Sequence, residues 1–332
     1  MNVIVTGAAG FIGGFLANYC AEAGCSVLGI DINEPSDVAS GTVFERCDVR
    51  DSEKLSPLIR SASPDCIFHL AAQSYPTVSL EKPGETMDVN ACGTIHLFES
   101  VRRLGTIPKV VVACSSAEYG PVAAADLPVR EDHPLRPLHP YGVSKVAQDL
   151  LAAQYFYNYS IPCVRIRIFN TTGPGKIGDV CSDLTKRAAE MQLGLRPRQL
   201  PVGNLTSRRA ILDVRDLVSA LWLSVERCGS GDVYNVCGRQ IYSVQELIES
   251  IKQLIGIGFE IEQNGTLMRG CDEPVIAGDT SKFQSRTGWS QTIHLMNTLR
   301  EMLSWWRTQL SSTRPDAITN SDPLSPARVF GR

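Results

Sequence analysis

The sequence has no excess of positive charge. Its 332 residues include 32 Lys and Arg and 35 Asp and Glu, which gives a formal net charge of −3 at pH 7. A protein that holds a nucleic-acid backbone needs a basic patch or stripe on one face. We therefore expect no nucleic-acid partner.

Paired cysteines are also missing. The 11 cysteines are an odd number, and no two of them have the CxxC spacing or lie in a His-rich neighbourhood. Zinc sites and disulfide frameworks both depend on such spacings. We expect reduced cysteines that fill the core, and no bound metal.

No apolar run approaches the roughly 20 residues that a membrane-spanning helix needs. The chain opens with the strand-like MNVIVTG, without the charged and apolar regions of a signal peptide. We therefore expect a cytoplasmic protein with no membrane segment.

The composition is that of a folded globular chain. Hydrophobic residues make up 43% and charged residues 20%, with 27 Gly and 19 Pro. A chain of this length forms either one large domain or two lobes that share a core.

Short apolar runs alternate with helix-length amphipathic stretches from residue 1 to about residue 170. This alternation is typical of βαβ units, and it predicts an α/β fold with a Rossmann-type, doubly wound parallel sheet. The expected strands are Asn2–Thr6, Ser26–Asp31, Val43–Cys47, Cys66–Leu70, Lys109–Ser115 and Cys163–Ile168, and the expected helices lie near Phe11–Ala23, Ser52–Arg60, Glu85–Leu104 and Tyr141–Tyr159.

The pattern changes after residue 170. A Gly- and Pro-rich loop leads into a region with few strands, over residues 171–310, which we expect to form a smaller C-terminal lobe. Such a lobe would cap the NAD(P)-binding domain of residues 1–170 and leave a substrate cleft between them. Residues 311–332 are rich in Ser, Pro, Asp and Thr, and we expect a disordered tail there.

The segment GAAGFIG places Gly7, Gly10 and Gly13 directly after the first expected strand, where a helix begins. Glycines at such a turn let backbone amides approach a pyrophosphate, and the helix N-terminus adds partial positive charge. The alternative is a glycine-rich turn that only packs a helix on a strand.

Asp31 ends the second expected strand, 18 residues after Gly13. A carboxylate there accepts hydrogen bonds from ribose hydroxyls and repels a 2′-phosphate, which favours NAD(H), with NADP(H) still possible. The alternative is a solvated aspartate at a strand end.

Further candidates follow the third and fourth strands. Asp48 and Val49 follow one strand, and Leu70, Ala71 and Ala72 follow the other, at the sheet edge where ligands of open α/β folds bind. For Asp48 a turn or helix-cap role explains the residue equally well.

Tyr141 and Lys145 are four residues apart at the start of an expected helix, so they share a face. An ammonium beside a phenol lowers the phenol's pKa and makes it a usable acid and base. Ser115 and Ser116, at the end of the fifth strand, could hydrogen-bond the same reacting oxygen. A pair of surface residues is the alternative.

A set of motifs in one order resembles the extended short-chain dehydrogenase/reductase family. They are TGAAGFIG, HLAAQS, Asn90 before CGT, CSSAEYG, PYGVSK, IFNTTGPG, VGNLTSRRAILDVRD, GDVYNVCG and GDTSKFQSRTGW, and they span about residues 1–310. Within that family the sequence is most similar to the nucleotide-sugar branch. Within this branch it most resembles the GDP-4-keto-6-deoxy-D-mannose reductases, and the GDP-mannose 4,6-dehydratases are near relatives.

The resemblance implies a triad in which Tyr141 transfers a proton, Lys145 binds the nicotinamide ribose, and a serine orients the sugar oxygen. A gapless register gives Ser115 as that serine, and a register with one gap gives Ser116. The resemblance also places Phe11, Ile12, Asn90 and Ile168 against the cofactor, Gln73, Ser116, Glu118 and Asn170 near the sugar, and Arg209 and Arg269 on the nucleotide diphosphate. Solvated surface charges are the alternative for the two arginines.

The reaction depends on a second carboxylate. A 4,6-dehydratase needs one beside the serine, and the gapless register puts Ala117 at that position, whereas a register with one deletion puts Glu118 there. A reductase needs only a hydride and the Tyr141 proton. We therefore expect an NAD(P)H-dependent reductase of a GDP-4-keto-6-deoxy-hexose.

The sequence leaves two alternative functions open. One alternative is a redox-neutral 4-epimerase or 4,6-dehydratase that holds NAD tightly, and a more distant one is a non-catalytic dinucleotide sensor. The resemblance further implies a homodimer through a four-helix bundle of the helices near residues 85–104 and 141–159.

Overall fold

The computed structural model describes residues 1–35, 41–265 and 275–312. The tail expected to be disordered falls almost wholly outside these residues, and the last helix, α11 (Leu295–Ser312), takes in its first two positions. Within the described ranges, no helix is both long and apolar enough to cross a membrane.

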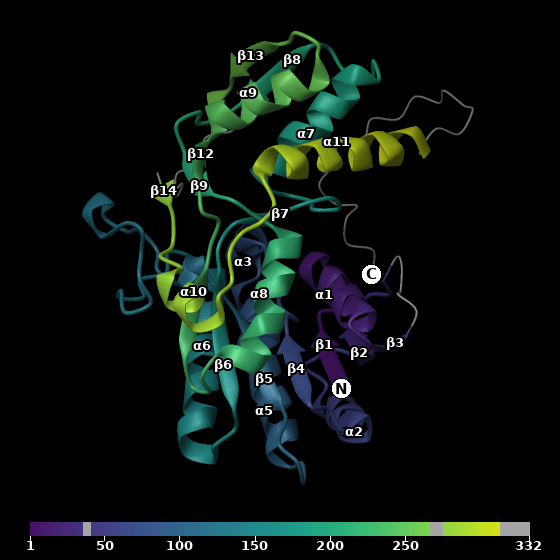
Figure 1. The fold of residues 1–332 in the computed structure, drawn as a ribbon, viewed down its shortest axis with the longest axis vertical. Coiled ribbons are helices and arrows are strands. Elements are labelled where there is room, and N and C mark those ends of the chain that lie inside the picture. The colour runs from purple at the N-terminus through teal and green to yellow at the C-terminus, as the bar shows by residue number, and fades with distance from the viewer. Residues whose placement is uncertain (36–40, 266–274, 313–332) are drawn as a thin grey trace.

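A single sheet of seven parallel strands forms the centre of the fold, in the order β11-β6-β5-β4-β1-β2-β3 (Figure 1). This confirms the doubly wound α/β fold. The strands are β1 (Asn2–Thr6), β2 (Ser26–Asp31), β3 (Thr42–Arg46), β4 (Cys66–His69), β5 (Lys109–Ser115), β6 (Cys163–Ile168) and β11 (Val233–Val236).

The sequence predicted six strands in this sheet, and β11 is the seventh. It pairs in parallel with β6, with Val233 opposite Arg165 and Val236 opposite Ile168. The chain therefore returns to the sheet from well beyond residue 170, where only the smaller lobe was expected.

Helices cover both faces of the sheet because its inner strands are apolar on both sides. In β1, Val3 and Val5 belong to the core under α1 (Phe11–Glu22) and α8 (Val214–Arg227), whereas Ile4 faces the opposite layer. That layer consists of α2 (Ser52–Ala62), α5 (Gly93–Arg102) and α6 (Pro140–Tyr159). Figure 1 shows α8 in front of the sheet.

The helix expected over residues 85–104 is divided. The structure has α3 (Pro76–Glu81), α4 (Pro83–Met87), a π-helical turn η1 (Asp88–Cys92) and then α5. Pro83 starts a new helix because proline has no amide hydrogen to continue the previous one. The wider π turn carries the buried Asn90.

The C-terminal lobe lies above one end of the sheet in Figure 1. Its core joins side chains of three helices, for example Leu184, Leu247 and Leu299. Its elements are α7 (Val180–Gln192), β8 (Gln199–Val202), β9 (Arg208–Ala210), β12 (Ile241–Ser243), α9 (Val244–Ile255), β13 (Glu260–Gln263), β14 (Val275–Ile276) and α11, and the connecting elements are η2 (Ser116–Glu118), η3 (Ala124–Asp126), β7 (Thr171–Thr172), β10 (Leu212–Asp213) and α10 (Ser281–Thr287).

The ten cysteines in the described residues are all free thiols. Nine are buried and Cys92 is exposed. Burial raises the pKa of several of these thiols, for example Cys20 to about 12, so they are neutral, unreactive groups of the core.

Candidate active site

The glycine-rich turn connects β1 to α1. Gly7 has a positive φ of 74°, and a Cβ on Gly13 would overlap the carbonyl oxygen of Gly7. Gly10 caps α1 without a side-chain hydrogen bond, and the first turn of the helix holds no acidic residue. The first-turn amides, including those of Phe11 and Ile12, therefore fit a pyrophosphate with no side chain competing for them.

Asp31 lies beside this turn. Its Oδ2 accepts a hydrogen bond from the Ala9 amide at 3.0 Å, and its Oδ1 accepts one from the Asn33 amide at 3.0 Å. The carboxylate is thus fixed at the carboxyl end of β2 next to the dinucleotide turn, which suits the predicted contact with a ribose.

The loop after β4 approaches the same turn. A Cβ on Gly7 would lie 2.8 Å from the Ala71 nitrogen, and the Ala71 amide donates to Thr6 Oγ1 at 3.2 Å. The fold therefore brings Leu70 and Ala71 to the glycine-rich turn, and the small side chains of Ala71 and the following Ala72 leave room there.

Asp48 is in a turn. Its Oδ1 accepts from the Arg50 amide at 2.9 Å, and its Oδ2 lies 2.6 Å from Arg50 Nη2. Hydrogen bonds from Arg50 lower the pKa of the Asp48 carboxyl. The neighbouring Val49 is buried against Gly93. In this structure Asp48 thus has the turn role that the sequence left as its alternative.

Ser115, Tyr141 and Lys145 converge where β5 ends and α6 begins. His139 caps α6 by accepting from the Gly142 amide at 3.1 Å. A Cβ on Gly142 would lie 2.7 Å from the Ala117 oxygen, so the start of α6 packs closely on η2. This packing brings the Tyr141 hydroxyl near the hydroxyl of Ser115, which acts to lower the pKa of Tyr141.

Burial shifts the pKa values of Tyr141 and Lys145 and so determines their charges. It raises the pKa of Tyr141 to about 12, against the opposing effect of the Ser115 hydroxyl, and it lowers the pKa of Lys145 to about 8. The Lys145 nitrogen lies 6.0 Å from the centre of the Tyr141 ring. The expected lowering of the phenol's pKa by the lysine is therefore not what this structure shows. Tyr141 is a neutral phenol, the form that can donate a proton.

Glu118 does not face the expected sugar site. It is fully buried, and its Oε1 accepts a hydrogen bond from the Ser115 amide at 2.7 Å. Its Oε2 lies 3.1 Å from Arg167 Nε, and burial together with Asp149 raises the Glu118 pKa. The expectation that Glu118 contacts substrate is thus wrong for this structure, because the side chain is drawn into a buried ionic cluster.

That cluster does not fit a metal ion. Ligand atoms of Cys114, Glu118 and Asp149 lie within 4.8 Å of one another. However, Asp149 is paired with Arg165 at 2.5 Å and with Arg167 at 2.9 Å. Two guanidinium groups already supply the positive charge that a metal would bring.

The side chains of Gln73 and Asn90 make hydrogen bonds to other groups of the protein. Gln73 Nε2 donates to the Tyr75 oxygen and to Thr86 Oγ1, each at 3.1 Å. Asn90 accepts from the Gln73 amide at 2.8 Å and donates to the Gln73 oxygen at 3.0 Å and to Ser144 Oγ at 2.8 Å. The two residues fix the loop after β4 to α6, and in this structure neither side chain is directed at a ligand.

Asn170 differs from these two. It follows β6, and its Nδ2 is buried without a hydrogen-bond partner in the described part of the chain. A buried donor without an acceptor costs free energy unless a ligand oxygen satisfies it. Ile168, the last residue of β6, lies opposite Ser115 in the sheet register, and Asn170 follows it by two residues.

The remaining predicted residues are dispersed. Ser116 is half-buried and lines a small apolar crevice with Phe169 and Ala277. Arg209 lies in β9 of the C-terminal lobe, between β12 and β14, and its Nη1 donates to the Arg208 oxygen at 2.9 Å. Arg269 lies outside the described residues.

Comparison with known proteins identifies the family. A family profile described as GDP-mannose 4,6 dehydratase matches residues 4–302. The chain belongs to this family. Because this family is part of the nucleotide-sugar branch of the extended short-chain dehydrogenases/reductases, the predicted family membership is confirmed.

The relatives of this member of the GDP-mannose 4,6-dehydratase family have different activities. It is 31% identical to the GDP-6-deoxy-D-mannose reductase of Pseudomonas aeruginosa, over 93% of this chain and 98% of the relative. The solved structure of RMD from the same organism, complexed with NADPH, matches with a TM-score of 0.82 and 28% identity, over 93% of this chain and all of the other. The UDP-glucose 4-epimerase of Thermus thermophilus in complex with NAD matches with a TM-score of 0.81 and 26% identity, over 92% and 99%.

Two features of this family member were not predicted. Gln148 contacts the Lys145 ammonium from three residues along α6, a spacing at which side chains of a helix meet. Arg165 and Arg167 alternate with apolar residues in the buried strand β6, and two charges in such a strand indicate a buried partner.

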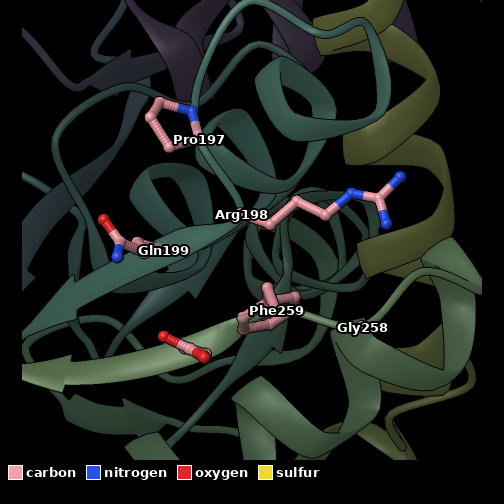
Figure 2. Close-up of a pocket in the computed structure, with 6 residues that line it drawn as sticks. Pro197, Arg198, Gln199, Gly258 and Phe259 are labelled. Carbon is pink, nitrogen blue, oxygen red and sulfur yellow. The ribbon is translucent and has the colours of Figure 1, made fainter.

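A further hollow of the described surface lies away from these residues. It measures about 520 Å³ and is open to solvent, at the starts of β8 and β13 in the C-terminal lobe (Figure 2). None of the predicted site residues lines it. Its walls are Pro197, Arg198, Gln199, Gly258, Phe259 and Glu260.

Proposed function

We propose that the protein reduces the C4 ketone of a GDP-4-keto-6-deoxy-hexose with NAD(P)H. The observation that carries the proposal is the neutral Tyr141 phenol near Ser115 and Lys145, in a site where the nearby Glu118 carboxylate is held by the Ser115 amide instead of pointing at the sugar. A ketone reduction needs a proton donor and no second carboxylate, whereas a 4,6-dehydration needs both.

The residues around the glycine-rich turn would hold the dinucleotide, which when bound supplies the hydride. The Ser115 hydroxyl orients the carbonyl oxygen, and Tyr141 donates its proton to that oxygen as negative charge develops on it. The Lys145 ammonium would bind the nicotinamide ribose. Asn170 Nδ2 donates to an oxygen of the nucleotide sugar, which would satisfy its buried hydrogen.

For the cofactor we propose a preference for NAD(H). The fixed carboxylate of Asp31, with Glu34 three residues beyond it, places negative charge where NADP(H) carries its 2′-phosphate. The Pseudomonas structure contains NADPH and the Thermus structure contains NAD, so each form is bound by one of these two relatives.

The test is to mix the purified protein with GDP-4-keto-6-deoxy-D-mannose and either NADH or NADPH, and to follow the reduced-nicotinamide absorbance. Stoichiometric oxidation, faster with NADH, is expected. Tyr141→Phe is the matched control, since it removes only the hydroxyl. Absence of oxidation with both cofactors would overturn the proposal in favour of a redox-neutral epimerase or dehydratase.

We further propose a cytoplasmic homodimer. Three large apolar side chains that follow one another at intervals of seven residues on α6, and so share a face, are exposed: Val143 by 46%, Leu150 by 55% and Tyr157 by 74%. An apolar helix face of this kind is stabilised when a second copy covers it. The buried free thiols support a reducing compartment.

A further inference from the structure

We infer that Gln148 is a positioning residue, which holds the Lys145 ammonium in place and whose own amide is oriented by a buried hydrogen-bonded chain through Thr94, His69 and Thr6. The inference rests on the proposed function only in giving Lys145 a role in catalysis. The contacts themselves come from four different elements of the fold.

Two acceptors surround the Lys145 ammonium. Lys145 Nζ donates to the Ala113 oxygen at 2.8 Å and to Gln148 Oε1 at 2.7 Å. Lys145 is 3% exposed and Gln148 is fully buried. With two of its three hydrogens assigned, the third hydrogen of the ammonium has a single direction left, toward the site.

Thr94 fixes the orientation of the Gln148 amide. Thr94 Oγ1 donates its one hydrogen to the Asn90 oxygen at 2.6 Å, so it can only accept from Gln148 Nε2, which lies 3.0 Å away. The NH₂ group of Gln148 must therefore face Thr94. As a result, Oε1 must face Lys145, which is the orientation that a cation needs.

The hydrogen-bonded chain continues from Thr94 through His69 to Thr6. His69 Nε2 lies 3.0 Å from Thr94 Oγ1, and His69 Nδ1 lies 2.8 Å from Thr6 Oγ1. Thr94 can only accept, so Nε2 carries the hydrogen and Nδ1 accepts from Thr6. Thr6 in turn accepts from the Ala71 amide at 3.2 Å. Every donor and acceptor has one possible assignment, and burial lowers the pKa of His69 to about 3, which keeps the imidazole neutral as the chain requires.

Other charged or titratable groups lie near Lys145 in the neighbouring elements. They are His69 from β4, Cys114 from β5, Glu118 from η2 and Tyr141 from its own helix. Burial lowers the pKa of Lys145, and Cys114 and Glu118 act in the opposite direction. Replacing Gln148 changes none of these groups, so the effect of its amide can be measured by itself.

The experiment compares Gln148→Met, which removes both hydrogen bonds at similar volume, with Gln148→Glu, which adds a negative charge. The protein has eight lysines, so 13Cε-labelled lysine gives a small set of NMR signals, and the loss of one in Lys145→Met assigns Lys145. Removing an acceptor favours the neutral amine and adding an anion favours the ammonium. We expect the Lys145 titration to move down by about one pH unit in Gln148→Met and up by about one in Gln148→Glu.

Turnover gives the second readout. In Gln148→Met we expect kcat to fall about tenfold with the KM for the keto-sugar little changed, and the alkaline limb of the rate profile to move to lower pH. Thr94→Ser should resemble the wild type, whereas Thr94→Val should shift Lys145 in the same direction as Gln148→Met. Gln192→Met is the control, since Gln192 is a partly buried glutamine of the other lobe whose side chain donates to the Ile255 oxygen at 3.1 Å.

The inference is overturned if the Lys145 titration stays in place in both Gln148 variants, or moves in the same direction in both. If the Gln148 variants fail to fold, the Thr94→Ser and Thr94→Val pair decides in the same way. The NMR titration needs no substrate, so a wild-type protein without reductase activity would overturn the proposed function and leave this result unaffected.

Discussion

Burial of two groups, a phenol and an amine, determines the chemistry of the site. Tyr141 remains protonated to about pH 12, and Lys145 is an ammonium below about pH 8. Near neutral pH the site therefore presents a proton donor and a cation together. This combination suits the addition of a proton to an oxygen that gains negative charge.

At the residue scale, Tyr141→Phe tests the proton donor. We expect kcat to fall by about 10²–10⁴-fold, the usual contribution of a general acid. Binding of NADH, followed by its fluorescence, should not change, because the ring and its packing remain. Turnover close to that of the wild type would contradict the role of Tyr141.

Asp31→Ala tests the cofactor preference. Loss of the carboxylate removes the expected ribose contacts and the repulsion of a 2′-phosphate. We expect the KM for NADH to rise and the ratio of kcat/KM for NADH over NADPH to fall by about tenfold, the effect of roughly 1.4 kcal/mol. An unchanged ratio would mean that Asp31 serves only to fix the glycine-rich turn through Ala9.

At the element scale, η2 depends on the capping box of Ser115 and Glu118. The raised pKa of Glu118 favours the protonated carboxyl, and Gln has nearly the same shape. We expect Glu118→Gln to fold and to keep most of its reductase activity. Glu118→Leu leaves the Ser115 amide without its acceptor and should lower the free energy of unfolding by about 1–3 kcal/mol in urea titrations.

The same pair of variants separates two reactions. If Glu118→Gln abolishes turnover while its urea midpoint stays at the wild-type value, Glu118 takes part in the chemistry. Such a result would favour a dehydratase, despite the buried position of the side chain.

β1, β4 and α5 are joined through His69, which makes the fold sensitive to acid. The pKa of His69 is lowered from 6.5 to about 3 in the folded protein. The unfolded chain therefore binds a proton that the folded chain does not, and stability is complete above pH 6.5 and is lost as pH falls toward 3. At pH 5 this costs about 2 kcal/mol.

The measurement is the free energy of unfolding at pH 7 and at pH 5 for the wild type and for His69→Gln. The wild type should lose about 2 kcal/mol more than the variant over this range. Equal losses would show that His69 is not the group responsible.

At the scale of the whole molecule, the sheet connects the two halves of the sequence. β11 pairs with β6, and Lys109 Nζ, at the start of β5, donates to the Val225 and Cys228 oxygens at the end of α8 at 2.7 and 2.8 Å. The dinucleotide sheet and the connections to the C-terminal lobe therefore depend on each other for stability.

The proposed homodimer is tested with Leu150→Glu. A charge on the exposed face of α6 would oppose a second copy there, and light scattering should give the mass of one chain instead of two. Leu195→Glu is the control, because Leu195 is 48% exposed but follows α7 in the C-terminal lobe. A wild-type mass equal to one chain would contradict the dimer.

The sequence by itself determined the features that depend on local spacing. The strands β1, β2, β5 and β6 have the predicted bounds, the glycine-rich turn follows β1, and Tyr141 and Lys145 share the first turns of α6. These follow from apolar runs, glycine conformations and helix periodicity, which act over a few residues.

Only the tertiary structure decided the features that depend on distant contacts. The direction of Glu118 follows from Arg167 and Asp149, the seventh strand follows from the edge offered by β6, and the orientation of Gln148 follows from Thr94, 54 residues earlier. In each case the side chain or strand could satisfy its polar groups in more than one way, and the partner that the fold brings near determines which way is adopted.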